Sequence, residues 1–184
     1  MVQESNKRGL GFTPCAICGV LRRHGMMSLA LDIKADFIAM GNTLEDEAET
    51  ILLNIIRGNL WKNYRDKIEY KPADRKSLLL RIKPLSEISE KTIRNNSKIH
   101  QLPILKIQCA FTHRSLRSEI APFLIKMDKK DPHILYNIVS SIQREKSIKT
   151  QVEKVYKCKN CSSYSSTPEY SACRMIQTII NYTM

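Results

Sequence analysis

The stretch FIAMGNTLEDEAETILLNII, residues 37–56, decides the expected fold. Its four opening residues predict a short buried strand over 37–40, which ends at Gly41. Apolar residues then recur at helical spacing and predict an amphipathic helix with one apolar face, formed by Ala48, Ile51, Leu52, Ile55 and Ile56. Thr43 is expected to cap this helix, and three acidic residues follow in its first turn.

Similar patterns on both sides of this stretch extend the prediction. Apolar runs predict further strands at 78–82 and 104–107, and helical periodicity predicts helices at 19–33, 86–95, 114–127 and 133–146. Residues 59–76 lack a clear period and are predicted to form a loop. Strands that alternate with helices indicate an α/β fold with a parallel sheet flanked by helices.

Composition changes near both ends of the chain. Residues 1–14 hold glycine and proline and few residues that can pack, so they are predicted to be a flexible lead-in. A cysteine pair and a serine-rich stretch follow residue 149 and indicate a small separate module. The predicted domains are therefore the lead-in 1–14, a main domain 15–149 and a C-terminal module 150–184.

The charge of the chain favours a polyanionic partner. The 184 residues contain 30 Lys and Arg against 18 Asp and Glu, a formal net charge of +12. An excess of this size favours nucleic acid, although solubility is the competing explanation. No apolar run is long enough to span a membrane and no signal peptide is evident, so a cytoplasmic location is expected.

The six cysteines fall into two sets. Cys15 and Cys18 form a Cys-x-x-Cys pair, which is typical of half a zinc site, a redox pair, part of an iron-sulfur site or two unrelated thiols. Cys158 and Cys161 form a second such pair and are followed by Cys173. This second spacing is typical of a zinc ribbon that lacks one of its four ligands.

Five segments in the same order give the chain a resemblance to a known family. They are TPCAICGVLRR (13–23), GNTLEDEAET with LNIIRG (41–58), KPLSEI (83–88), CAFTHRSLR (109–117) and the terminal cysteine module. Together they resemble tRNA-uridine 2-thiolation enzymes of the TtcA/TtuA type, over residues 13 to about 175. The resemblance implies an ATP-pyrophosphatase-like fold, of which this chain matches the C-terminal portion, with a zinc-ribbon-like module.

The resemblance also implies a chemistry. In such enzymes ATP with Mg²⁺ adenylates the C2 oxygen of a tRNA uridine, and sulfur then replaces the activated oxygen. Cys15, Cys18 and Cys109 would bind a [4Fe-4S] cluster that leaves one iron open. Asp46 matches the catalytic aspartate, and zinc would be bound by the ribbon residues Cys158, Cys161 and Cys173.

Several basic residues and one glycine are implied to contact ATP or tRNA phosphate; they are Arg22, Arg23, Gly41, Arg114 and Arg117. For Asp46 the competing interpretation is ordinary acidic charge at the start of a helix. For Arg22 and Arg23 the competing interpretation is a solvated basic face.

Three departures from the family pattern shape the functional hypotheses. The Ser-Gly-Gly-x-Asp-Ser loop that cradles ATP phosphates does not occur in these residues. The Gly-His-Asn-x-Asp-Asp segment is replaced here by Gly-Asn-Thr-Leu-Glu-Asp over 41–46. Tyr170 stands where a further ribbon cysteine is expected.

These departures favour a split enzyme, in which a second polypeptide supplies the pyrophosphate loop. A sulfur carrier protein and a second copy of the chain in a homodimer are the other expected protein partners. A non-catalytic, zinc-containing tRNA-binding relic is the main alternative. An iron-sulfur carrier without tRNA affinity is a third hypothesis.

Overall fold

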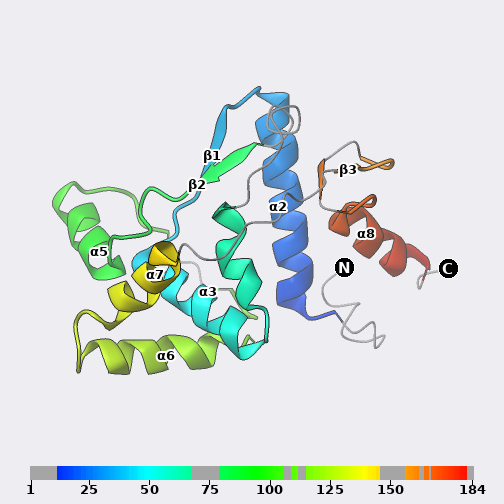
Figure 1. Cartoon of the computed structure of the whole chain (residues 1–184). Coiled ribbons are helices and arrows are strands. Elements are labelled where there is room, and N and C mark those ends of the chain that lie inside the picture. The colour runs from blue at the N-terminus through cyan, green and yellow to red at the C-terminus, as the bar shows by residue number, and fades with distance from the viewer. Residues whose placement is uncertain are drawn as a thin grey trace. The chain divides into compact units, whose positions relative to one another are not determined.

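The computed structural model describes residues 12–67, 79–105, 109–111, 115–145, 156–161, 164–165 and 167–181. The chain divides into two compact units, each assembled from separate stretches of sequence. The first unit comprises Met1–Ile38, Glu69–Arg81 and Val152–Met184, and the second comprises Ala39–Ile68 and Ile82–Gln151. Figure 1 labels helices and strands from both units where there is room.

The second unit is built around three helices, α3 (Leu44–Ile56), α6 (Arg117–Asp128) and α7 (Ile134–Arg144). In Figure 1, α3 runs beside both α6 and α7, and its contacts with them enclose the core. The buried residues of this core are Ala48, Ile51, Leu53, Ile120, Leu124, Leu135 and Val139. The predictions of these three helices are confirmed, but Ile55 and Ile56 at the end of the predicted apolar face are exposed.

The start of α3 follows the predicted capping arrangement. Thr43 Oγ1 accepts a hydrogen bond from the Asp46 backbone N–H at 3.3 Å, and Asp46 Oδ2 accepts one from the Thr43 backbone N–H at 3.1 Å. This reciprocal pair is a capping box, which satisfies two helix-end donors at once.

A 3₁₀ helix, η1 (Leu60–Lys67), occupies part of the stretch that was predicted to be a loop. That prediction is wrong for these residues because side-chain contacts fix the backbone. Asn54 donates to Asn63 Oδ1 at 2.6 Å, Asn63 Nδ2 donates to the Ile51 carbonyl at 3.4 Å, and Tyr64 is buried. Residues 68–76 of the predicted loop lie outside the described residues.

Helix α5 (Glu90–Ile99) begins later than predicted. Its cap is Ser89, whose Oγ accepts from the Thr92 backbone N–H at 3.2 Å, and Ser86 belongs to the preceding turn. The described side chains of α5 include none that is buried. The Ser89 cap, and not the burial of side chains, therefore determines where α5 begins.

Strands β1 (Phe37–Ala39) and β2 (Leu80–Ile82) pair in a small parallel sheet and confirm two predicted strands. The predicted burial of the first of these strands is wrong, because Phe37 is more than half exposed, and Leu80 in the second strand is exposed to a similar extent. Among the described residues, this sheet has no third strand. Ile104 and Leu105 are not in a strand, and residues 106–108 of the third predicted strand lie outside the described residues.

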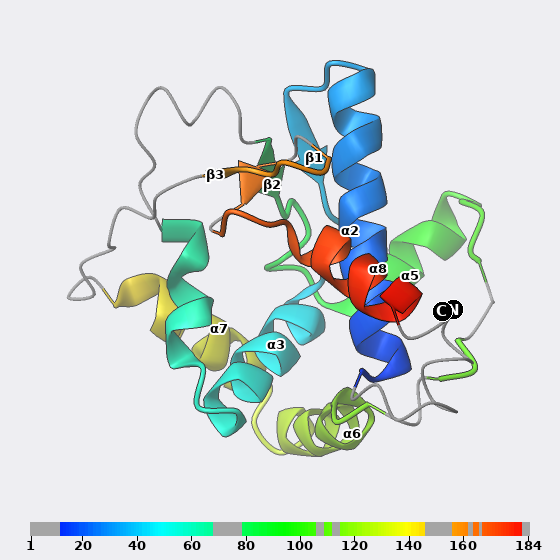
Figure 2. The same ribbon diagram turned by 90° about the vertical axis from the view of Figure 1, so that its right-hand side faces the viewer.

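The first unit contains α2 (Pro14–Asp32), α8 (Ser171–Asn181) and a hairpin of β3 (Tyr156–Lys157) and β4 (Tyr164–Ser165). The hairpin is antiparallel, with Tyr156 opposite Ser165. Figure 2 shows α8 against α2, where a small core forms from Ile17, Met175 and Ile179. Helix α8 was not predicted from the sequence.

Helix α2 begins five residues before its predicted start. Thr13 caps it by accepting a hydrogen bond from the Ala16 backbone N–H at 3.2 Å, and Pro14 occupies a first-turn position that tolerates proline. Cys15 and Cys18, which were expected just before a helix, therefore lie inside it. Among the described helices, none combines the length and apolar character that a membrane span requires.

Candidate functional site

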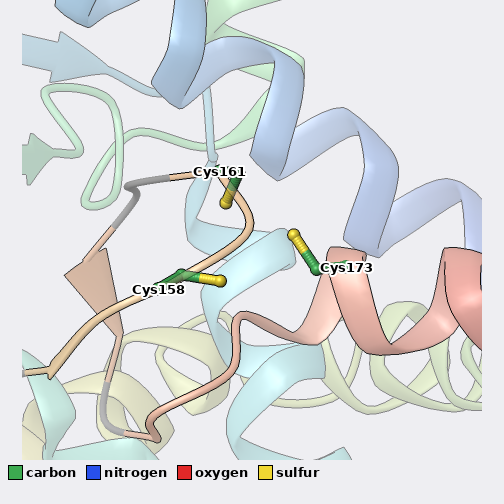
Figure 3. A group of neighbouring side chains, drawn as sticks. All are labelled: Cys158, Cys161 and Cys173. Carbon is green, nitrogen blue, oxygen red and sulfur yellow. The ribbon is translucent and has the colours of Figure 1, made fainter.

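Three cysteines of the first unit converge on one point. Cys158 and Cys161 come from the turn that follows β3, and Cys173 comes from the first turn of α8. Their Sγ atoms lie within 4.8 Å of one another, and Figure 3 shows the three side chains directed toward a shared centre. The group offers three sulfur donors to a soft or borderline metal ion.

Hydrogen bonding and burial act differently on these thiols. The backbone N–H of Tyr170 donates to Cys158 Sγ at 3.3 Å, and this bond is the main reason why the pKa of Cys158 falls to about 7. Burial raises the pKa of Cys173 to about 12, and the neighbouring cysteines add to that rise. One thiol thus ionises readily, whereas the ionisation of another requires a nearby positive charge, which a metal ion supplies.

Tyr170, which bonds to Cys158 through its backbone, also contacts a second aromatic ring. The ring centroids of His24, on α2, and Tyr170 are 5.1 Å apart, with the rings tilted by 44°. His24 Nδ1 is buried and has no hydrogen-bond partner within the described part of the chain. Burial raises the pKa of Tyr170, while Arg81 and Arg23 act in the opposite direction.

The first Cys-x-x-Cys pair lies on one exposed face of α2. Cys15 and Cys18 are three residues apart in the helix and therefore project from neighbouring positions. Both side chains are exposed, as is that of Cys109 in the second unit. Exposed thiols from such a pair, close to a helix N-terminus, fit the thiolate donors that an iron-sulfur cluster needs.

Asp46 is held by contacts within the second unit. Besides its part in the capping box, its Oδ1 accepts from Arg117 Nη1 at 3.0 Å. Arg117 also donates to Thr50 Oγ1 at 2.8 Å and lies 3.4 Å from Glu49. Arg117 was predicted to contact ATP or tRNA, and in this structure its guanidinium binds the side chains of α3.

The other predicted contact residues are less constrained. Arg22 and Arg23 are exposed on α2, and Arg23 extends back toward Gly19. Gly41 is exposed, and an added Cβ there would meet no atom within 4 Å, so contacts within the described structure do not require glycine. Arg114 lies outside the described residues.

Sequence reasoning missed three residues around these sites. Burial raises the pKa of Glu49, with Arg117 opposing the shift. Lys83, in the KPLSEI segment, forms a 2.9 Å ion pair with Glu47. The third is His24, whose heptad spacing from Ile17 was the available signal, since it places both residues on the same face of α2.

Comparison with known proteins places these features in context. The chain is 28% identical over 177 residues to the tRNA 2-thiolation protein NcsA of Haloferax volcanii, across 90% of this chain and 55% of that protein. It is 30% identical over 168 residues to cytoplasmic tRNA 2-thiolation protein 1 of Aedes aegypti, across 89% of this chain and 48% of that protein.

A solved structure is similar to this chain as well. The chain superposes on the U34-tRNA thiolase NcsA from Methanococcus maripaludis, solved with its [4Fe-4S] cluster, with a TM-score of 0.73 and 28% identity. The match covers 94% of this chain and 54% of that one. The chain is a relative of the tRNA 2-thiolation proteins.

This relationship to the tRNA 2-thiolation proteins confirms the resemblance drawn from the five sequence segments. The chain spans about half the length of the curated relatives it matches. No family model matches the chain.

Proposed function

We propose that this chain acts in cytoplasmic tRNA 2-thiolation, as the cluster-bearing part of a sulfurtransferase that forms 2-thiouridine. The main support is the similarity to tRNA 2-thiolation proteins over about nine-tenths of the chain, together with the fold match to a tRNA thiolase. The net charge of +12 fits a tRNA substrate.

The proposed reaction has two steps. The C2 oxygen of uridine attacks the α-phosphate of ATP and pyrophosphate leaves. A sulfur nucleophile then bonds to C2, and the C2–O bond breaks as AMP departs with the oxygen. A second polypeptide with the pyrophosphate loop is proposed to bind ATP and Mg²⁺, because that loop does not occur in these residues. A sulfur carrier protein is the proposed sulfur source.

The exposed cysteines take the cluster-binding role in this proposal. Cys15, Cys18 and Cys109 offer accessible thiolates, and a bound [4Fe-4S] cluster would supply sulfur-handling chemistry through the iron that no protein thiolate holds. Arg22 and Arg23 contact tRNA or ATP phosphate from the exposed surface of the same helix.

Asp46 and Arg117 act together in the proposed site. Each side chain remains about two-fifths exposed while the two are paired, so Asp46 keeps a solvent-facing surface. The pair fixes the carboxylate where it can orient a substrate or accept a proton. Arg117 is then a positioning residue for Asp46, and this role replaces the direct nucleotide contact predicted from the sequence.

The three-cysteine group is proposed to bind zinc. Three convergent sulfurs, one of them buried, fit the donor set of a structural zinc site. The role is to stabilise the first unit, since the group ties α8 to the β3–β4 hairpin.

Anaerobic purification of the full chain, alone and with a pyrophosphate-loop polypeptide, tests the proposal. Iron and sulfide content should fall in Cys15→Ser, Cys18→Ser and Cys109→Ser, but not in the control Lys98→Ala at an exposed residue of α5. The reconstituted pair should form 2-thiouridine in tRNA. Zinc without iron in the wild-type chain would contradict the cluster and favour a non-catalytic tRNA-binding protein, for which the formed three-cysteine group is the supporting observation.

A further inference from the structure

We propose that His24 is the fourth ligand of the metal centre formed by Cys158, Cys161 and Cys173. The inference rests on the zinc-binding role proposed above. It goes further by assigning a fourth ligand, since Tyr170 occupies the position where the ribbon pattern has its remaining cysteine. It is independent of the thiolation chemistry.

The packing of α2 on α8 places His24 near the cysteines. Ile17 clusters with Met175 and Ile179, which lie in the turns of α8 that follow its first turn. His24 lies two helical turns after Ile17 on the same face of α2, and its ring contacts Tyr170, immediately before α8 begins. The apolar face of α2 therefore leads from the later turns of α8 toward the turn that holds Cys173.

The bonding state of His24 also points to a ligand. Its Nδ1 is buried and has no hydrogen-bond partner among the described residues. Buried polar atoms are nearly always satisfied, and an exception calls for an unseen ion or water. A neutral imidazole nitrogen is one of the two commonest zinc donors, so a metal ion beside this ring would satisfy Nδ1.

Charge balance favours a neutral fourth ligand. Zinc with three thiolates has one net negative charge, and a fourth thiolate would double it, whereas an imidazole adds none. Arg23 and Arg81 lie close enough to influence Tyr170 and can offset a single negative charge. A Cys₃His centre is a common structural zinc set, whereas a tyrosine phenol is not among the usual donors.

The assignment requires the His24 side chain to rotate toward the cysteines. The group within 4.8 Å comprises only the three cysteines among the residues described, so His24 lies outside it in this structure. One residue connects them, because Tyr170 contacts the His24 ring and also donates its backbone N–H to Cys158 Sγ. Rotation about the first two side-chain torsions moves an imidazole between staggered positions without moving α2.

Glu169 is the competing protein donor. It precedes Tyr170, and its Oε1 accepts from Asn160 Nδ2 at 3.4 Å. A carboxylate ligand would add a second net negative charge to the centre, which the neutral imidazole avoids. Glu169→Gln is therefore the matched test of this alternative.

Zinc X-ray absorption on the full chain, with affinity measured by chelator competition, tests the assignment. The wild-type spectrum should show three sulfurs and the outer-shell scattering of one imidazole. In His24→Ala that scattering should disappear and zinc affinity should fall at least about tenfold. In His24→Cys the site should contain four sulfurs. Glu169→Gln and His100→Ala, a substitution at an exposed histidine of the second unit, should leave both readouts unchanged.

Three results would overturn the proposal. They are a wild-type site with three sulfurs and oxygen, loss of affinity in Glu169→Gln instead of His24→Ala, and a chain that binds no zinc. Only the last also removes the three-cysteine zinc site, so the two failures are distinct. If His24→Ala does not fold, the wild-type and His24→Cys spectra decide.

Discussion

Nη1 of Arg117 lies 3.0 Å from Oδ1 of Asp46, so the first residue of α6 is bonded to the capping box of α3. These residues are 71 positions apart in the chain. The bond links the CAFTHRSLR segment to the GNTLEDEAET segment, which were recognised separately in the sequence. It also means that the charge of Asp46 is already compensated before any substrate binds.

Removing this bond should have a modest effect on stability. Arg117→Ala is expected to lower the free energy of unfolding by about 1 kcal/mol, because both side chains are partly exposed and solvent screens the pair. A double-mutant cycle with Asp46→Ala should give a coupling energy of about 0.5–1 kcal/mol in urea unfolding. The control Arg94→Ala, which removes an exposed ion pair with Glu90, should change stability by less than about 0.5 kcal/mol. A coupling energy of zero would show that the 3.0 Å bond does not persist in solution.

The capping box gives a second stability prediction. Thr43→Ala removes the side-chain acceptor for the Asp46 backbone N–H and should lower the free energy of unfolding by about 1 kcal/mol. Thr43→Ser keeps that oxygen and should stay within about 0.5 kcal/mol of the wild type. Equal losses in the two variants would argue that the methyl group, and not the hydroxyl, is responsible.

The raised pKa of Glu49 predicts that the stability of the fold depends on pH. Burial raises its pKa in the folded chain, so the folded state binds the proton more tightly than the unfolded state. Its contribution to stability is therefore fully present below the unfolded pKa and is lost as the pH rises through the raised folded pKa. Glu49→Gln removes this titration, so its stability relative to the wild type should increase from about pH 4 upward. Thermal unfolding of both proteins across pH 4 to 8 measures the difference in stability. A fall in the stability of Glu49→Gln relative to the wild type as the pH rises would contradict the raised pKa.

The core of the second unit should be sensitive to truncation at Leu124. This residue is 3% exposed in a cluster with α3 and α7, so Leu124→Ala should cost about 2–5 kcal/mol in urea unfolding. Phe123→Ala, the neighbour on the same helix, is the control because Phe123 is 53% exposed. The control should cost much less, and similar losses at both positions would mean that Phe123 is covered in solution.

Arg22 predicts a salt-dependent effect on tRNA affinity. If it contacts a phosphate, Arg22→Ala should weaken tRNA binding and reduce the slope of log affinity against log salt by about 1. Arg22→Lys keeps the charge and should preserve that slope. Fluorescence anisotropy with tRNA at several salt concentrations provides the readout, and an unchanged slope in Arg22→Ala would remove the residue from the interface.

The sequence predicted the elements whose signals are local. The helix at Leu44–Ile56 follows from its apolar period and from Thr43 and Asp46, all within one short stretch. The convergence of Cys158, Cys161 and Cys173 followed from zinc-site spacing in the same way. The early start of α2 also has a local signal in Thr13 and Pro14. The glycine and proline content of residues 1–14 instead led to the prediction of a flexible segment before Cys15.

Other features depend on contacts that no local pattern shows. The η1 helix forms because Asn63 bonds to Asn54 and the backbone of α3, and its own residues have no helical period. The bond between Arg117 and Asp46 joins distant segments, so its presence required the packing of α6 against α3. His24 is similar, because its ring is placed by the contact with Tyr170 and not by neighbouring residues.

The three-part composition of the first unit has a consequence for biosynthesis. Helix α2 is translated before the second unit, whereas Met175 and Ile179, which pack with its Ile17, are translated after it. During most of translation the apolar face of α2 therefore lacks its final partner, while α3, α6 and α7 can already close around their own core. The nascent chain should acquire protease resistance in the second unit first. A ribosome-bound chain stalled before residue 171 would then expose Ile17 on a helix that has not yet docked.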